Sequence, residues 1–245
     1  MSPRPVKNAN SEFEEHATDL IAAAPPQFRR IYQRDLRALQ KRGVHTFDAL
    51  ATALPRMKGR VAETALRLVT GFGRAKAVPV LVPLLERGSA WALADLGGAR
   101  ACAACLAVLR SDVHVRVRVA AAYALTFMHD DRAGPALIDC VRDRTEDTEV
   151  RAQAAEGLAE LFEMNARHRL FKTAAKVALA GLSDPSPTIR FWCAFALGKM
   201  RYRPAIPALR RVVKRDRALC PGWWRVADEA RDAIAWIEGR PTPGR

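Results

Sequence analysis

Two cysteines spaced as a metal-binding pair stand near the middle of the chain. Cys102 and Cys105 form a C-x-x-C motif in an alanine-rich stretch, and no second pair lies nearby. Structural zinc sites normally use four ligands, so we interpret both cysteines as small residues that pack between helices. The five histidines are scattered, and no Ser-His-Asp or Cys-His arrangement stands out. The sequence therefore predicts no catalytic residues, no metal and no cofactor.

Basic residues are concentrated between Lys199 and Arg217, where Asp216 is the only acidic residue. Arg210, Lys214 and Arg217 are spaced to share one stripe of a helix. Such a stripe can neutralise the phosphates of a nucleic acid or the carboxylates of an acidic protein. The alternative is a solvated charged face without a partner. Our candidate partner-binding residues are Lys172, Lys176, Arg201, Arg203, Arg210, Arg211, Lys214 and Arg217.

An aromatic group forms the second set of candidates. Trp223 and Trp224 follow a Pro-Gly pair at which we expect a helix to start. Asp228 lies four residues after Trp224, so both side chains are predicted on one face of that helix. The simpler interpretation is a pair of tryptophans in the core and at its cap.

These candidates lie within a repeated pattern of helix pairs. A β-branched residue, an arginine, two small residues and a leucine recur in segments that start at Val117, Val150 and Ile189, with weaker copies at Val61 and Val226. The intervals are close to the ~40 residues of helical-pair repeats. A second pattern follows, with a proline predicted in the first turn of a helix: Pro79, Pro135 and Pro207. Each pair must stack on its neighbours to bury its apolar stripes.

The repeats resemble the HEAT-like repeats of the phycobilisome-lyase type, over residues 61–239. The resemblance implies that Arg118, Arg151 and Arg190, at one position of three successive repeats, bridge neighbouring repeats through an acid. Acids precede all three arginines: Asp112, Glu146 with Asp147, and Asp184. It also implies that second helices line the concave face, so that Lys172, Lys176, Arg210 and Lys214 would form a basic inner groove.

The Trp-Trp-x-x-x-Asp spacing is similar to one in HEAT-fold alkylpurine DNA glycosylases. By that similarity Trp224 would stack on a nucleotide and Asp228 would stabilise developing charge on the sugar. In that family further helices follow and complete the site, whereas here the motif lies in the last repeat. HEAT-like deoxyhypusine hydroxylases bind iron through His-Glu dipeptides, and this sequence contains none.

The N-terminal part departs from the repeat pattern. Ser11-Glu-Phe-Glu14 is a capping box that should open a helix reaching about Ala24. A second helix is predicted over 26–42, with Phe28, Ile31, Leu36 and Leu39 on one side, and a short third over 46–54. We therefore predict a disordered tail over 1–10, a helical cap over 11–57, a repeat solenoid over 58–239 and a second tail over 240–245.

The charge and composition indicate a class of partner. The net charge is +14 and the pI about 10.3. This excess of basic residues favours acidic partners; the alternative is that it reflects only the composition of a GC-rich genome. An acidic band over 130–163 interrupts the basic ends, which suits a protein partner at least as well as a nucleic acid. No stretch is apolar enough for a membrane span and the start lacks a signal-peptide core, so we expect a soluble, cytoplasmic protein. We also expect it to be a monomer.

Together these patterns predict an all-α, right-handed α-solenoid of about five to six HEAT-like repeats behind a helical cap. We expect a non-catalytic scaffold that binds a protein partner along its concave face. Two alternatives stay open: a nucleic-acid-binding protein that uses basic second helices, and a HEAT-like enzyme, either a chromophore lyase or glycosylase-like. Architecture of this kind hosts many activities, so the choice depends on the site.

Overall fold

The computed structural model of the chain describes residues 8–111, 114–163 and 165–242. In these ranges the regular structure is helical, apart from an isolated bridge between Leu219 and Arg225. The chain divides into two compact units, Met1–Leu96 and Gly97–Arg245. Within each unit, helices pack mainly against helices one or two places away along the chain, as the predicted α-solenoid requires. None of the described helices is both long and apolar enough to cross a bilayer.

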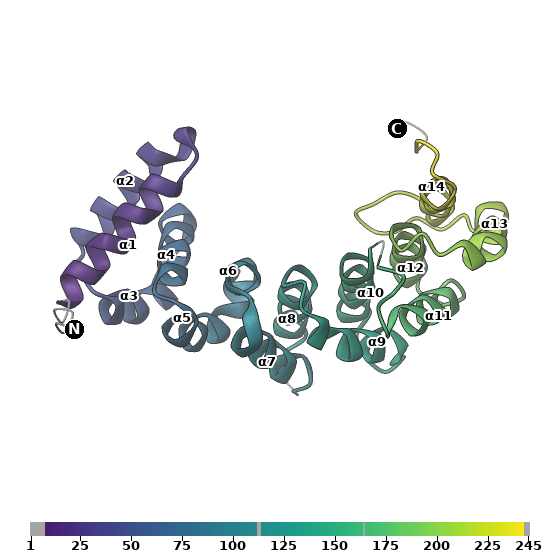
Figure 1. Cartoon of the computed structure of the whole chain (residues 1–245), viewed down its shortest axis with the longest axis horizontal. Coiled ribbons are helices and arrows are strands. Elements are labelled where there is room, and N and C mark those ends of the chain that lie inside the picture. The colour runs from purple at the N-terminus through teal and green to yellow at the C-terminus, as the bar shows by residue number, and fades with distance from the viewer. Residues whose placement is uncertain (1–7, 112–113, 164, 243–245) are drawn as a thin grey trace. The chain divides into compact units, whose positions relative to one another are not determined.

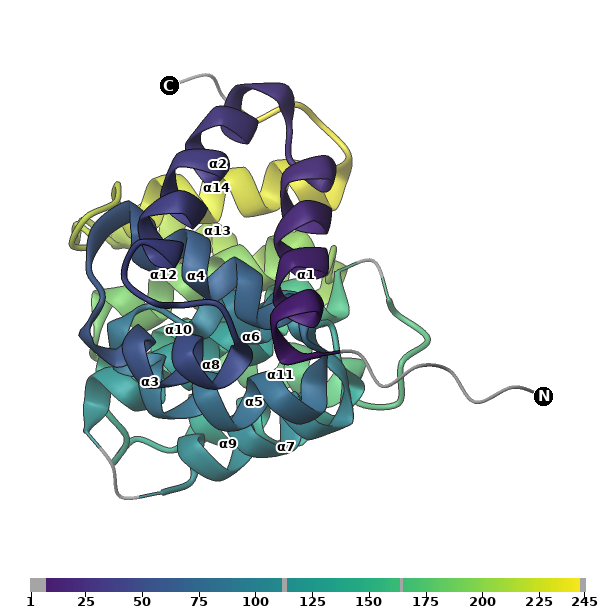
Figure 2. The same ribbon diagram turned by 90° about the vertical axis from the view of Figure 1, so that its left-hand side faces the viewer.

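Unit 1 begins with an antiparallel helix pair, α1 and α2 (Figure 2). Both helices pack on α4, which forms the centre of the unit, and α5 and α6 follow. The ring of Phe72, at the end of α4, contacts Phe13 and Phe47 and so joins α4 to α1 and α3. The helices of unit 1 are α1 (Ala9–Ala23), α2 (Pro26–Gln40), α3 (Phe47–Ala53), α4 (Gly59–Gly71), α5 (Arg74–Leu81) and α6 (Ala90–Leu96), with 3-10 turns at Leu54–Arg56 and Val82–Arg87.

Two local predictions in unit 1 are wrong. Asn8, not Ser11, caps α1, because its side chain accepts from the backbone N–H of Asn10, so Ala9 and Asn10 belong to the helix and not to a tail. The apolar side predicted for α2 is buried at Leu36 and Leu39, while Phe28 at its start is 43% exposed. Pro79 lies well inside α5, because that helix already starts at Arg74; Pro135 and Pro207 do lie in first turns.

Unit 2 consists of two rows of helices (Figure 1). The row α8, α10, α12 and α14 lies on the concave side of this unit, and the row α7, α9, α11 and α13 lies outside it. We call them the inner and the outer row. The helices are α7 (Gly98–Leu109), α8 (Val115–Phe127), α9 (Gly134–Arg142), α10 (Thr148–Phe162), α11 (Phe171–Gly181), α12 (Pro187–Lys199), α13 (Ile206–Arg215) and α14 (Val226–Glu238).

Small residues explain why unit 2 curves in this direction. A Cβ atom on Gly157 of α10 would lie 2.8 Å from Thr126 Oγ1 of α8, and one on Gly198 of α12 would lie 2.7 Å from Ala233 Cα of α14. Inner-row neighbours therefore approach closely and share extensive contacts, whereas outer-row neighbours share few. The outer helices are spread apart, and the spaces between them form the grooves described below.

Candidate functional site

The three repeat arginines each form an ion pair with an acid of the following repeat. Arg118 donates to both carboxylate oxygens of Glu146, at 2.7 and 3.1 Å. Arg151 Nη2 lies 2.7 Å from Asp184 Oδ2, and both side chains are buried. Arg190 Nε lies 2.6 Å from Asp216 Oδ2. Glu146 and Asp184 are acids that the sequence places before the next arginine of the series. Asp112, which precedes Arg118, lies outside the described residues.

The two more buried carboxyls in this series are held in the charged state. Burial by itself would raise the pKa of Asp184, but hydrogen bonds from the Arg151 side chain and the Ser186 backbone, with the arginine charge, lower it below the usual value. The same balance lowers the pKa of Asp216, where Arg190 and the Ala218 backbone donate. Both acids therefore stay ionised at neutral pH and keep the inter-repeat bridges formed.

Each ion pair contributes to the lining of a groove between two successive outer-row helices. The α7–α9 groove contains Arg118 and Glu146 and has a volume of about 520 Å³. The α9–α11 groove contains Arg151 and Asp184 and has a volume of about 400 Å³. The α11–α13 groove contains Arg190 and Asp216 and has a volume of about 590 Å³. The three grooves are thus equivalent positions of the repeat.

The remaining charges differ between these equivalent grooves. Besides its ion pair, the α7–α9 groove is lined by Arg110, Asp139 and Asp143. The α9–α11 groove is lined instead by Arg142, Arg144 and Lys176, and the α11–α13 groove by Arg211 and Arg215. One groove is therefore slightly acidic and the next two are basic. Arg142, Arg144 and Arg215 were not among the sequence candidates.

The structure separates the predicted basic residues into several places. Lys176 and Arg211 line grooves, and Lys172, Arg210 and Lys214 are exposed on the same two outer-row helices, α11 and α13. The prediction of a concave basic groove is wrong for unit 2, because its second helices form the outer row (Figure 1).

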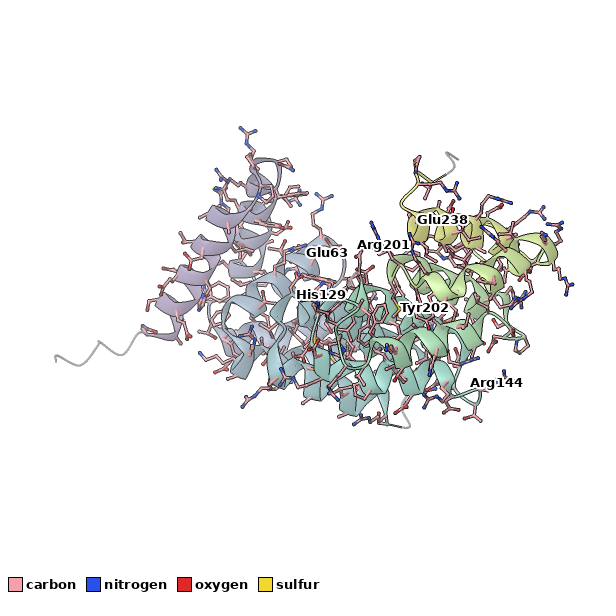
Figure 3. All side chains as sticks on the ribbon, turned by 45° about the vertical axis from the view of Figure 1, so that its right-hand side comes forward. Glu63, His129, Arg144, Arg201, Tyr202 and Glu238 are labelled. Atoms are coloured by element: carbon pink, nitrogen blue, oxygen red, sulfur yellow. The ribbon has the colours of Figure 1, made fainter. Side chains whose placement is uncertain are left out.

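Three arginines lie apart from the grooves. Arg217 follows the last residue of α13 and so does not share the stripe of Arg210 and Lys214. Arg201 has a left-handed backbone (φ 51°) where α12 ends, and it lies on the opposite side of unit 2 from the groove residue Arg144 (Figure 3). Arg203 lies two residues later. A hydrogen bond from Arg240 lowers the pKa of Glu238 on α14, and the charge of Arg203 contributes least to this effect.

The inner row carries an aromatic cluster. Trp192 and Phe195 of α12 contact each other edge to face, with ring centroids 5.4 Å apart. Trp192 also contacts Trp223, at 5.2 Å, and Phe195 contacts Trp236 of α14, at 5.7 Å. Trp223 is 48% exposed. Because α10, α11 and α14 cover the other sides of α12, the partly exposed rings of Trp192 and Phe195 face the concave side.

The helix α10, which packs beside α12 in the inner row, carries a polar stripe with two acids. Gln153, Glu156 and Glu160 are partly exposed at helical spacing. Burial raises the pKa of Glu156, and the nearby charge of Glu160 adds to the effect, although Gln153 donates a hydrogen bond that opposes it. Of the aromatic cluster and this stripe, only Trp223 was among the candidates predicted from the sequence. The spacing of Trp192 and Phe195, three residues apart in α12, was the signal that could have revealed the cluster.

Trp224 and Asp228 do not share a helix face, so the glycosylase-like arrangement is not formed. The helix α14 starts at Val226, and Trp224 lies before it in an extended segment. Trp224 Nε1 donates to Oε2 of the buried Glu229, at 2.8 Å. Asp228 pairs instead with Arg231, at 2.6 Å. The two side chains therefore have separate structural partners.

The cysteines are buried thiols. All five are free and buried. Burial, with a smaller contribution from Cys102, raises the pKa of Cys105 to about 12, and burial does the same for Cys140 and Cys193. A neutral thiol is a weak nucleophile and a weak metal ligand. Among the described residues, no group of three or more Cys, His, Asp or Glu side chains is arranged to hold a metal ion.

Comparison with solved structures finds repeat proteins of low identity. An engineered protein has 20% identity and a TM-score of 0.47, over 96% of this chain and 69% of that one. A designed armadillo repeat protein has 14% identity and a TM-score of 0.46, over 94% and 100%. Human deoxyhypusine hydroxylase in complex with glycerol has 20% identity and a TM-score of 0.38, over 80% and 86%. No curated protein matches the chain.

Comparison with protein families identifies the repeats themselves. A family model described as HEAT repeats matches residues 86–159 and 142–219, a span that includes the three arginine bridges and the three grooves. The match is to HEAT repeats in general and does not select the phycobilisome-lyase type. Because it extends over more than half of the sequence, the chain belongs to the family of HEAT repeat proteins.

Proposed function

We propose that this protein is a non-catalytic scaffold that binds a protein partner on the aromatic surface of the inner row. HEAT and armadillo-like repeats are commonly used for protein interaction. The observation that carries the proposal is the aromatic cluster around Trp192, Phe195, Trp223 and Trp236, with Trp223 about half exposed. In this proposal the protein works as a monomer and without a cofactor.

Aromatic side chains of this kind suit a binding site for two reasons. Tryptophan is the residue type most enriched among those that contribute most to protein interfaces. The edge-to-face contacts of Trp192 with Phe195 and with Trp223 already restrict their rotamers, so little side-chain entropy is left to lose on binding. The carboxylates of Glu156 and Glu160 on the neighbouring helix α10 favour a partner segment that combines apolar and basic residues.

A capture experiment with matched variants tests this function. The immobilised wild-type chain should retain a stoichiometric partner from a native lysate, and Trp223→Ala should weaken that complex by about 2 kcal/mol or more because a central interface tryptophan is lost. Phe28→Ala is the control, since it removes a similarly exposed ring from unit 1. Circular dichroism of both variants verifies that they fold.

Two results would contradict the proposal. Retention of the partner by Trp223→Ala with unchanged affinity would show that the aromatic surface does not bind it. Equal loss in Phe28→Ala and Trp223→Ala would show that capture depends on exposed apolar rings in general and not on this site.

A further inference from the structure

We propose that the α9–α11 and α11–α13 grooves bind an acidic, extended segment of a partner protein. Apolar side chains of that segment would enter the grooves, and its carboxylates would meet the arginines and lysines at the rims. This site lies on the outer row and depends on different residues from the aromatic surface of the inner row. Its failure and the failure of the proposed function can therefore be told apart.

The charge of the outer row is the first argument. Helices α11 and α13 contain no acidic residue. They contribute six basic side chains, and in the described part of the chain the one ion pair recorded for these is Arg210 with Glu238, at 3.5 Å. Arg142, at the α9–α11 rim, is 3.6 Å from Asp139, but both are largely exposed, and such pairs contribute little. The rims therefore keep a net positive charge that attracts carboxylates or phosphates.

The groove linings distinguish between those two kinds of ligand. Besides Arg211 and Arg215, the lining of the α11–α13 groove contains the apolar side chains of Leu179, Leu182, Pro207 and Val212. The lining of the α9–α11 groove likewise contains Val141, Val177 and Ala180 besides Arg142, Arg144 and Lys176. A phosphate backbone has no apolar side chains to place against these residues, whereas a peptide does. The combination of apolar lining and basic rim thus favours an acidic peptide over a nucleic acid.

The third groove sets a boundary to this site. In the α7–α9 groove the charges besides the ion pair are Asp139 and Asp143, with Arg110 as the one basic residue. Like charges would repel an acidic segment there. We therefore expect the segment to occupy the two basic grooves and to end before the acidic one.

Fluorescence anisotropy of the full-length chain with a synthetic probe tests the proposal. The probe is a labelled peptide of glutamates interrupted by phenylalanines. Two double variants each reverse one rim, Arg142→Glu with Lys176→Glu and Arg211→Glu with Arg215→Glu. The control, Arg30→Glu with Arg37→Glu, makes the same change in net charge on exposed residues of α2. Each groove variant should weaken binding at least about tenfold, and the control by less than about twofold.

Further probes decide between an acidic peptide and any polyanion. A peptide with serine in place of each phenylalanine should bind about tenfold more weakly than the original, and binding of the original should weaken as salt is added. Equal binding of the serine peptide, or of a single-stranded oligonucleotide of the same charge, would overturn the proposal, as would equal losses in the control variant. If a glutamate variant does not fold, Arg211→Gln with Arg215→Gln makes a milder test in which unchanged binding would also overturn it.

Discussion

At the residue scale, the buried pair Arg151–Asp184 shows how one side chain joins two repeats. Arg151 donates to Asp184 and, through the same Nη2 atom, to the backbone oxygen of Val141, at 2.7 and 3.1 Å. Arg151→Met should lower the free energy of unfolding by about 3–5 kcal/mol, because it leaves a buried carboxylate without its partner. Urea denaturation measures the loss.

Two further variants show whether the unpaired charge causes this loss. Arg151→Met combined with Asp184→Leu should recover much of the stability, since neither charge is then buried alone. Arg132→Met breaks the pair of Arg132 with Asp130, in which the arginine side chain is 55% exposed, and should cost at most about 1 kcal/mol. If Arg151→Met alone lowered the free energy of unfolding no more than Arg132→Met does, the buried bridge would contribute little.

The arginines of these bridges could be predicted from the sequence, but the geometry of their partners could not. The arginines recur at one position of the repeat pattern, whereas their acids follow 28, 33 and 26 residues later, in loops of different length. Trp224 and Asp228 show the opposite failure. Their spacing was right for a helix face, but Val226 N–H bonds back to the oxygen of Ala218, and the helix starts only at Val226, after Trp224.

At the scale of the helices, two glycines set the distance between inner-row neighbours. A Cβ on Gly198 would lie 2.7 Å from backbone atom Cα of Ala233 and 2.9 Å from its Cβ. The extra methyl group would therefore fit only if the backbone of α12 or α14 shifted. Gly198→Ala should therefore lower the free energy of unfolding by about 1–3 kcal/mol, as overpacked cores do, although alanine favours a helix. Thermal or urea unfolding measures the change.

Gly71 provides the matched control for this prediction. It also lies in a helix, α4, but a Cβ there would meet His16 at an ordinary 3.5 Å. Gly71→Ala should be neutral or should stabilise by up to about 1 kcal/mol, because alanine is the better helix former. If Gly198→Ala behaved in the same way, close packing of α12 on α14 would not be what restricts that position.

The row of helices on the concave side was predicted wrongly, because the prediction followed the general resemblance to HEAT-like families and not the sizes of the side chains. The small residues of the pattern, such as Ala154, Ala155, Cys193 and Ala194, all belong to first helices, and they are fully buried. Close approach of the first helices places them on the concave side of unit 2. The helical pairs and their order were predictable, since apolar periodicity determines them; which row lies inside required this further comparison of side-chain sizes.

At the scale of the whole molecule, charge counted along the chain misrepresents charge in space. The sequence shows an acidic band over 130–163, yet the structure distributes its members over different surfaces. Asp139 and Asp143 line the α7–α9 groove, while Arg142 and Arg144, interleaved with them, line the α9–α11 groove. These residues alternate along α9 and the loop after it, and successive side chains point into different grooves. The basic site was therefore only partly predictable: α11 and α13 were identified, but two of its five basic rim residues, Arg142 and Arg144, lie within the acidic band.

The charge balance of the whole chain also predicts how it responds to acid. The pKa values of Asp184 and Asp216 are lowered in the folded state, so the stability that they contribute is complete at neutral pH and is lost as the pH falls below about 4 and through the folded values. Protonation of the 26 acidic side chains would also leave 40 lysines and arginines unopposed, and their repulsion favours unfolding. The melting temperature should therefore fall steeply below about pH 4.

Salt separates these two causes in a melting experiment followed by circular dichroism. Added salt near 1 M reduces the screening length to about 3 Å, which should remove most of the long-range repulsion and raise the melting temperature at low pH. It cannot restore ion pairs whose carboxyls are protonated, so part of the loss should persist. That remaining part should be smaller in Arg151→Met with Asp184→Leu, because this variant has one fewer carboxyl with a lowered pKa. Complete recovery by salt in the wild type would show that the bridges contribute no pH-dependent stability.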